Sequence, residues 1–202
     1  MHFDSHDAVA VLSLPSGGRY PRLTRAVLGE IKDLLMAIRR EDSFHGVVIA
    51  SSGASFATGA DLEEVSQLYG ERARAFAGLG QRIFGEIEQF PVPVVAAIRG
   101  YCLGGGLDLA LACHARVASY DASFGHPGAS LGLITGWGGT QRLPRLIGEA
   151  QALQMLVTGD RIPATQALTI GLIDELHPAS DLIDGAVRRA EQLASVATLD
   201  VR

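Results

Sequence analysis

Short apolar runs alternate along this chain with longer stretches in which apolar residues recur at helical spacing. The runs at residues 8–14, 46–51 and 92–98 predict buried strands, because they are short, partly β-branched and followed by turn-forming residues. The first helical stretch should end among Arg39, Arg40 and Glu41. Its apolar positions recur every three or four residues, at Leu23, Val27, Ile31, Leu34, Leu35 and Ile38.

The rest of the chain continues the same alternation. Turns are expected at residues 15–18 and 100–106, and a glycine-rich loop at 128–139. Because strands and helices follow one another in turn, the pattern predicts an α/β fold. Further helices are expected at 61–69, 71–90, 107–113, 151–157, 163–170 and 183–194, a strand at 115–119 and a strand-like link at 172–176.

Composition narrows the class of protein. A chain of 202 residues favours a single domain, with a core over about 8–180 and a C-terminal helix at about 183–195. The net charge of −5 argues against nucleic acid as a partner. No apolar run reaches the length of a membrane span, and the polar residues 1–7 do not resemble a signal peptide, so a cytoplasmic protein without a membrane partner is expected. Cys102 and Cys113 fit no metal-ligand spacing and are expected to be buried thiols, with no metal site.

Two predicted strands end in glycine-containing turns, at Gly59-Ala60-Asp61 and at Gly104-Gly105-Gly106. Neither turn fits a dinucleotide-binding fingerprint, and the chain lacks the Gly-Lys-Ser/Thr of a phosphate-binding loop. One interpretation is that bare backbone N–H groups converge there on a ligand oxygen and form an oxyanion hole. The other is that the glycines serve only close packing.

Four consecutive segments resemble the motifs of the enoyl-CoA hydratase/isomerase (crotonase) superfamily. They are SFATGADLEEV, PVPVVAAIRGYCLGGGLDLALAC, FGHPGASLGLITGWGGTQRLPRLIG and LVTGDRIPATQALTIGLIDEL, and the resemblance runs from about residue 9 to 194. It implies a crotonase-like spiral of ββα units with surrounding helices, usually assembled as trimers. Relative to typical members, the C-terminal helices would be truncated.

The resemblance also implies the chemistry. Members stabilise the enolate of an acyl-CoA thioester with two backbone N–H groups, which here are those of Ala60 and Gly105. Because the donors are main-chain atoms, side-chain identity should matter little at these two positions. Coenzyme A is expected as part of the substrate, with no separately bound cofactor. Substrate-binding positions are expected at Gly59, Asp61, Leu62, Gly104, Gly128, Leu133, Thr135 and Trp137.

The sequence departs from a hydratase at both catalytic glutamates. The first is Asp108 here, which keeps a carboxylate on a side chain shorter by one methylene; it is expected to be the remaining acid/base or, alternatively, to favour its helix N-terminus. The second is Gly128, which cannot transfer a proton. His126 is either a group that titrates near neutrality or a structural neighbour. Trp137 is expected to form a wall of the acyl pocket.

Another departure concerns coenzyme A. Glu63 stands where members often carry a lysine near the phosphates, and a carboxylate there repels them. Arg19, Arg22 and Arg25 could compensate, or they could form a solvated helix start.

The sequence therefore predicts a lyase or isomerase of the enoyl-CoA hydratase/isomerase family, acting in fatty acid metabolism as a homo-oligomer. With a single carboxylate, isomerisation, decarboxylation or weak hydration is expected rather than efficient hydration. The alternatives are a catalytically inactive crotonase-fold binding or assembly protein and, as a weaker one, a CoA-independent hydrolase that uses the same oxyanion hole.

Overall fold

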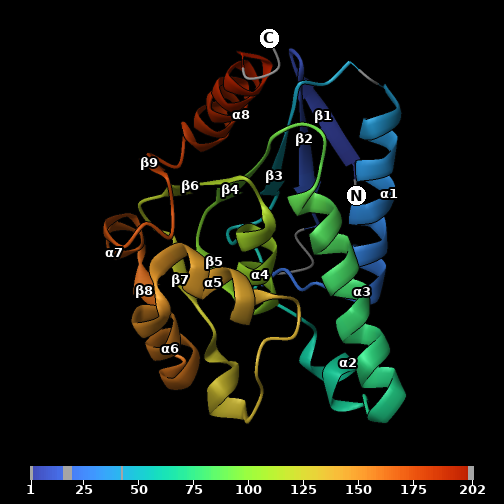
Figure 1. Ribbon diagram of the computed structural model, residues 1–202, viewed down its shortest axis with the longest axis vertical. Helices are drawn as coiled ribbons and strands as arrows, with labels where there is room; N and C mark the ends of the chain where they lie inside the picture. Colours follow the sequence, from blue (N-terminus) through green and yellow to red (C-terminus); the bar gives the residue numbers. More distant parts are fainter. Residues whose placement is uncertain (1, 16–19, 42, 200–202) are drawn as a thin grey trace.

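A six-stranded sheet forms the centre of the computed structural model, which describes residues 2–15, 20–41 and 43–199. The strand order is β1-β2-β3-β4-β6-β9, and β1 alone runs antiparallel to its neighbour (Figure 1). A second sheet has the order β5-β7-β8. The strands are β1 His2–His6, β2 Val9–Leu14, β3 Gly46–Ser51, β4 Val94–Ile98, β5 Tyr101–Leu103, β6 Ala115–Ser119, β7 Ser123–Gly125, β8 Ile162–Pro163 and β9 Glu175–His177.

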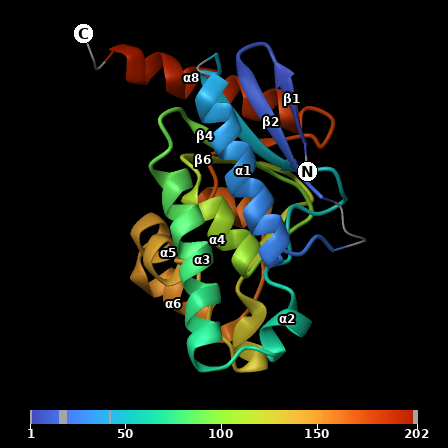
Figure 2. The same cartoon turned by 90° about the vertical axis from the view of Figure 1, so that its right-hand side faces the viewer.

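Helices cover both faces of the large sheet, because alternate residues of its parallel strands point to opposite sides. Val9, Val48 and Val95 pack against Leu182 and Ala186 of α8 on one face. The other face lies under α1, α3 and α4 (Figure 2). The helices are α1 Arg25–Glu41, α2 Leu62–Ser66, α3 Gly70–Glu88, α4 Gly105–Ala112, α5 Gly139–Ile147, α6 Glu149–Thr158, α7 Ala164–Thr169 and α8 Leu182–Leu199, with a 3-10 turn η1 at Pro127–Leu131.

Two of the three short strands of the second sheet closely follow strands of the first. Two residues separate β4 from β5 and three separate β6 from β7, so the chain crosses from the first sheet to the second twice. A bridge between Ala57 and Cys102 adds the segment after β3 to the same layer. This repeated strand–strand–helix path confirms the expected crotonase-like α/β fold. It also brings the segments after β3 and β4 side by side.

Most predicted elements are confirmed, with ends shifted by a few residues, but several assignments were wrong. The helix expected at 61–69 is shorter, since α2 ends at Ser66, and the separate helix expected at 71–90 is α3, which begins at Gly70. The turn expected at 100–106 contains β5 and the start of α4. Helix α5 was missed, because it begins on glycine and contains Pro144. The short or polar strands β1, β7 and β8 were missed too, and most of the turn expected at 15–18 lies outside the described residues.

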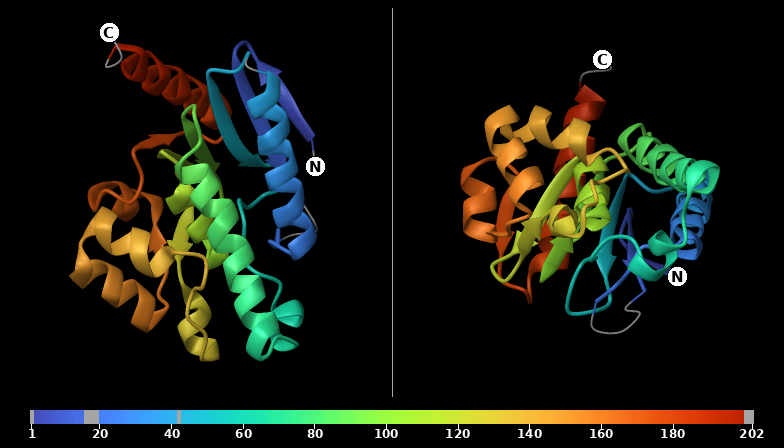
Figure 3. Two further views of the ribbon diagram at one scale, coloured as in Figure 1. Left: turned by 45° about the vertical axis from the view of Figure 1, so that its right-hand side comes forward. Right: turned by 90° about the horizontal axis from the view of Figure 1, so that it is seen from below.

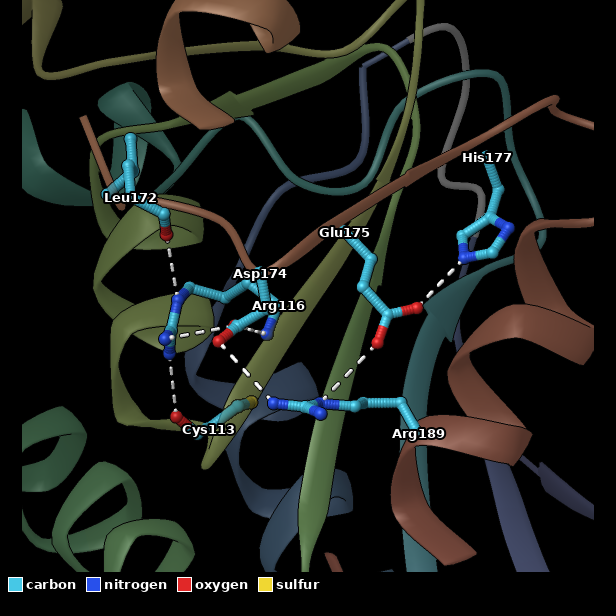
Figure 4. Close-up of polar contacts among 7 residues, drawn as sticks. All are labelled: Cys113, Arg116, Leu172, Asp174, Glu175, His177 and Arg189. Atoms are coloured by element: carbon cyan, nitrogen blue, oxygen red, sulfur yellow. Dashed lines mark hydrogen bonds and ion pairs between the residues drawn. The ribbon is translucent and has the colours of Figure 1, made fainter. Parts of the chain in front are cut away.

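A buried arginine on β6 connects this strand to the segment that precedes β9, the last strand of the large sheet. Arg116 on β6 is 6% exposed and donates to the carbonyls of Leu172 and Cys113 at 2.8 and 2.9 Å. Its backbone N–H and guanidinium both reach Asp174 Oδ2, at 2.8 and 3.3 Å (Figure 4). Arg189 of α8 lies beyond, 3.6 Å from Glu175, whose other oxygen is 3.0 Å from His177. The network therefore fixes β9 between β6 and α8.

Replacing Arg116 by alanine is expected to lower the free energy of unfolding by about 2 to 3 kcal/mol. The change leaves two carbonyls without their donor and removes the guanidinium from Asp174, which keeps the backbone N–H of residue 116; the partial exposure of Asp174 also keeps the cost below that of a fully buried pair. Urea unfolding measures the effect. Arg188→Ala, at an exposed position of α8, is the control and should change stability by less than about 0.5 kcal/mol. Equal stabilities of the two variants would contradict the role given to Arg116.

Candidate active site

Two backbone amides that precede or begin a helix lie close together. A methyl group placed on Gly59 would lie 2.9 Å from the amide nitrogen of Gly105, and one placed on Gly105 would lie 3.5 Å from that of Ala60. Gly105 is the first residue of α4, so its N–H has no partner within the helix. Among the described residues, neither amide donates to another backbone group. The geometry therefore brings together two N–H groups able to bind one oxygen.

Glycine is required at both ends of this arrangement. Gly59 has a φ of +93°, a conformation that side chains disfavour, and its α-carbon faces the amide of Gly105. A side chain on Gly105 would overlap the indole ring of Trp137. The expectation that side-chain identity matters little was therefore wrong for Gly105, because the constraint comes from packing and not from hydrogen bonding.

A largely apolar pocket of about 410 Å³ opens beside the two amides. Its walls come from α2, α3, η1 and the loop that follows η1; α2 and η1 lie at the lower end of the molecule in Figure 1 and in the left view of Figure 3. Seven of the eight predicted substrate-binding residues line it, together with Ala60 and Gly105. Those seven are Gly59, Leu62, Gly104, Gly128, Leu133, Thr135 and Trp137.

Trp137 is a wall of this pocket and also a packing centre. Its ring lies 5.2 and 5.7 Å from those of Phe76 and Phe84 on α3, in edge-to-face contact. The indole N–H donates to the Phe76 carbonyl at 3.3 Å. A side chain on Gly80 would overlap the indole as one on Gly105 would, so Trp137 fills the space between α3 and α4.

Asp108 is fully buried on α4, next to the pocket and not in its lining. One carboxyl oxygen accepts hydrogen bonds from the Thr135 hydroxyl and from the Trp137 N–H, the latter at 3.1 Å. The other oxygen has no hydrogen-bond partner among the described residues. Burial raises the pKa of Asp108 to about 6, although the two hydrogen bonds act in the opposite direction. The carboxyl group can therefore take up and release a proton near neutral pH.

His126 follows β7 and is 3% exposed. Its Nε2 lies 3.8 Å from the unpartnered oxygen of Asp108, and neither ring nitrogen makes a hydrogen bond to the described part of the chain. Burial lowers the pKa of His126 to about 4, so the imidazole is neutral at physiological pH.

Gly128 lies in η1 and contributes backbone to the pocket. The Leu133 N–H donates to its carbonyl at 2.9 Å, and a methyl group on Gly128 would lie 3.1 Å from the Leu133 oxygen, so the backbone of the loop occupies the space a side chain would enter. No aspartate or glutamate is among the described residues that line the pocket.

Asp61 differs from the other predicted substrate-binding residues, because it is not part of the pocket lining. Its carboxylate caps α2 by accepting from the N–H groups of Glu63 and Glu64, and it pairs with Arg22 at 2.8 Å. Arg25 pairs with Glu64 at the same distance. Two of the three arginines proposed to compensate for Glu63 are thus bound to acidic side chains around α2, and the third, Arg19, lies outside the described residues.

Some residues of the pocket were not predicted from the sequence. Phe76 and Leu156 line it from α3 and α6, far apart in the sequence. Helical periodicity marks Phe76 as a core residue, but nothing local shows that the buried face of its helix ends at a cavity.

None of the helices in the described ranges has the length and apolarity needed to cross a lipid bilayer. The described residues also contain no cluster of three or more histidine, cysteine or acidic side chains suited to a metal ion.

Comparison with known proteins agrees with this fold. The family model described as "Enoyl-CoA hydratase/isomerase" matches residues 5–202. An enoyl-CoA hydratase from Bacillus anthracis has a TM-score of 0.90 and 37% sequence identity over 96% of this chain and 76% of its own. DspI from Pseudomonas aeruginosa has a TM-score of 0.90 and 31% identity over 96% of this chain and 74% of its own. The chain belongs to the enoyl-CoA hydratase/isomerase family.

One curated relative is much longer than this chain. The fatty acid oxidation complex subunit alpha of Shewanella sp. (strain MR-4) is 44% identical over 190 residues, which make up 91% of this chain and 27% of the relative. The chain thus spans about a quarter of the length of that relative, and the similarity concerns only the matched part.

Proposed function

We propose that this chain acts on an acyl-CoA thioester and moves a double bond within its acyl group by proton transfer. The Ala60 and Gly105 N–H groups hold the thioester oxygen while the enolate forms. The proton transfer depends on Asp108. The observation that carries this proposal is the pair of converging amides beside an apolar pocket with one buried carboxyl group next to it.

Double-bond isomerisation suits this site better than hydration. It needs one group that removes a proton from one carbon and returns it to another, with no water in the reaction. Efficient hydration needs a second group to activate water, and the position of the second glutamate is the glycine of η1. Because the pKa of Asp108 is raised to about 6, its carboxyl group can support a single acid–base centre through both proton transfers at neutral pH.

The relatives support the substrate class. The hydratase from Bacillus anthracis is named for enoyl-CoA, and the Shewanella relative belongs to a fatty acid oxidation complex. We therefore propose an enoyl-CoA substrate in fatty acid metabolism, with coenzyme A brought by the substrate and no other cofactor. The homo-oligomer and the cytoplasmic location remain predictions.

The purified protein is expected to convert a 3-enoyl-CoA to the conjugated 2-enoyl-CoA at least about tenfold faster than it hydrates crotonyl-CoA, since one acid–base centre supports the first reaction and not the second. The change in ultraviolet absorbance of the conjugated thioester follows both reactions. Decarboxylation is tested in parallel with a malonyl-type thioester. Faster hydration, or decarboxylation alone, would contradict the isomerase assignment.

A second candidate is a binding protein without turnover. It is favoured by the enclosure of Asp108, whose free oxygen is not exposed to the pocket. Titration calorimetry with a 2-enoyl-CoA separates the candidates when it is combined with the isomerisation assay. Binding without turnover would favour the second candidate, and the absence of binding at millimolar ligand would contradict both.

A further inference from the structure

We propose that the His126 imidazole is the group that exchanges the proton with the acyl group, and that Asp108 positions this imidazole and stabilises its charged form. The inference rests on the proposed function and assigns to Asp108 and His126 separate parts of the same proton transfer.

Position beside the pocket is the first argument. His126 is the only titratable side chain among the described residues that line the pocket; its ring nitrogens are buried, as is the Asp108 carboxyl group, which lies behind that lining. An aspartate reaches less far than a glutamate by one methylene. A neutral imidazole between the carboxylate and the pocket makes up for the missing reach.

Unused hydrogen-bonding capacity is the second argument. The only buried side-chain nitrogen and oxygen atoms without a hydrogen-bond partner in the described chain are Asp108 Oδ1, both ring nitrogens of His126 and Nε of Arg189. Three of these four atoms belong to one pair, 3.8 Å apart at its nearest oxygen and nitrogen. Leaving such groups unpaired costs stability, and in native proteins an orphaned buried group calls for a functional explanation. A movement of less than about 1 Å would close the distance to a hydrogen bond.

The carboxylate is held in place for this role. Thr135 and Trp137 both donate to the oxygen of Asp108 that faces away from His126. The remaining oxygen can therefore accept from the imidazole and set which ring nitrogen carries the proton. The same division of roles orients the histidine of a serine-protease triad, where the aspartate stays ionised.

The steps balance without a further reactant. The C–H bond at the α-carbon of a 3-enoyl thioester breaks, its electron pair passes into the enolate held by the Ala60 and Gly105 N–H groups, and the proton moves to His126. The proton, shared between His126 and the Asp108 carboxylate, then returns to the γ-carbon. The double bond shifts by one position, and the protein is regenerated.

The charged and titratable groups next to the pair do not take up the proton. Arg142 of α5 acts on Asp108 only through its charge and is itself bound to Glu88 at 2.8 Å. Cys102 of β5 is fully buried, and its thiol pKa is raised well above the ordinary value, so it stays protonated. Among these groups, the exchange is confined to Asp108 and His126.

The test compares wild type, His126→Gln, Asp108→Asn and, as a matched histidine control, His45→Gln at an exposed position before β3. We expect His126→Gln to lower kcat for isomerisation, and the rate of α-proton exchange in D₂O, by roughly 100-fold or more, while the Kd for 2-enoyl-CoA changes less than about threefold. His45→Gln should match wild type. Retention of the wild-type rate by His126→Gln, with a loss in Asp108→Asn, would overturn the inference and leave the proposed function intact.

Failure of the proposed function is distinguishable from failure of this inference, because wild type itself would then show neither isomerisation nor α-proton exchange. A second measurement keeps the pair testable in that case and also if His126→Gln does not fold. The ¹⁵N resonances of the His126 ring at neutral pH are expected to report a single tautomer in wild type and a mixture of tautomers in Asp108→Asn. Identical resonances in the two proteins would show that Asp108 does not position the imidazole.

Discussion

Replacing Asp108 by asparagine is expected to lower kcat for double-bond isomerisation by roughly 100- to 10,000-fold, the range of general acid–base catalysis. The amide keeps the shape of the side chain and its contact with Thr135, so binding of the acyl-CoA should persist. Isomerisation kinetics and titration calorimetry measure the two quantities. Loss of binding together with turnover would point to a structural role for Asp108 and contradict the proposal.

The same variant should be more stable than wild type at neutral pH, by on the order of 2 to 3 kcal/mol. The pKa of Asp108 is raised from 3.8 to about 6, so between these values the folded protein binds more protons than the unfolded chain. Stability contributed by the protonated carboxyl group is present below pH 4 and is lost as the pH rises through 6. Asparagine stays uncharged and escapes this loss.

His126 has the opposite effect on how stability depends on pH. Its pKa is lowered from 6.5 to about 4, so the unfolded chain binds the extra proton and stability rises with pH across that interval. In wild type, Asp108 and His126 change the stability in opposite directions as the pH rises from 4 to 6. Urea unfolding should therefore show a stability that rises with pH in Asp108→Asn and falls with pH in His126→Gln. Parallel curves for the two variants would contradict the assigned shifts.

The second large effect is expected from Gly105→Ala, which should lower kcat by roughly 100- to 1,000-fold and stability by about 1 to 3 kcal/mol. The added methyl group overlaps the Trp137 indole, so either the ring or the start of α4 must move. Movement of α4 displaces one of the two oxyanion donors.

Gly29→Ala on α1 is the matched control, since a methyl group there has nothing within 4 Å and should stabilise the helix by about 0.5 to 1 kcal/mol. Pairing Gly105→Ala with Trp137→Phe removes the overlapping part of the indole and should recover some of the lost stability. Wild-type activity and stability in Gly105→Ala alone would show that the ring moves freely and that the donor is not held by this packing.

Much of the scaffold could be read from the sequence, because it depends on neighbours along the chain. The continuous apolar runs of β2, β3 and β4 predict strands with two buried faces, and the spacing in α1 predicts its inward stripe. These strands and this helix follow from local periodicity. The two glycine turns left two interpretations open, and the pairing of Ala60 with Gly105 was expected only from the resemblance to the enoyl-CoA hydratase/isomerase family.

The chemistry of the site was decided by the tertiary structure. Whether Asp108 caps its helix or is available for proton transfer depends on Thr135 and Trp137, which fold back onto it from the far side of η1. From the sequence, Arg22 could have been available to bind a phosphate. Only its distance to Asp61 shows that it forms an ion pair within the chain. His126 was left open between two roles until its burial, its unpaired nitrogens and the carboxylate at 3.8 Å were known. Burial and distance between groups remote in the chain set charge and pKa, and no local pattern contains them.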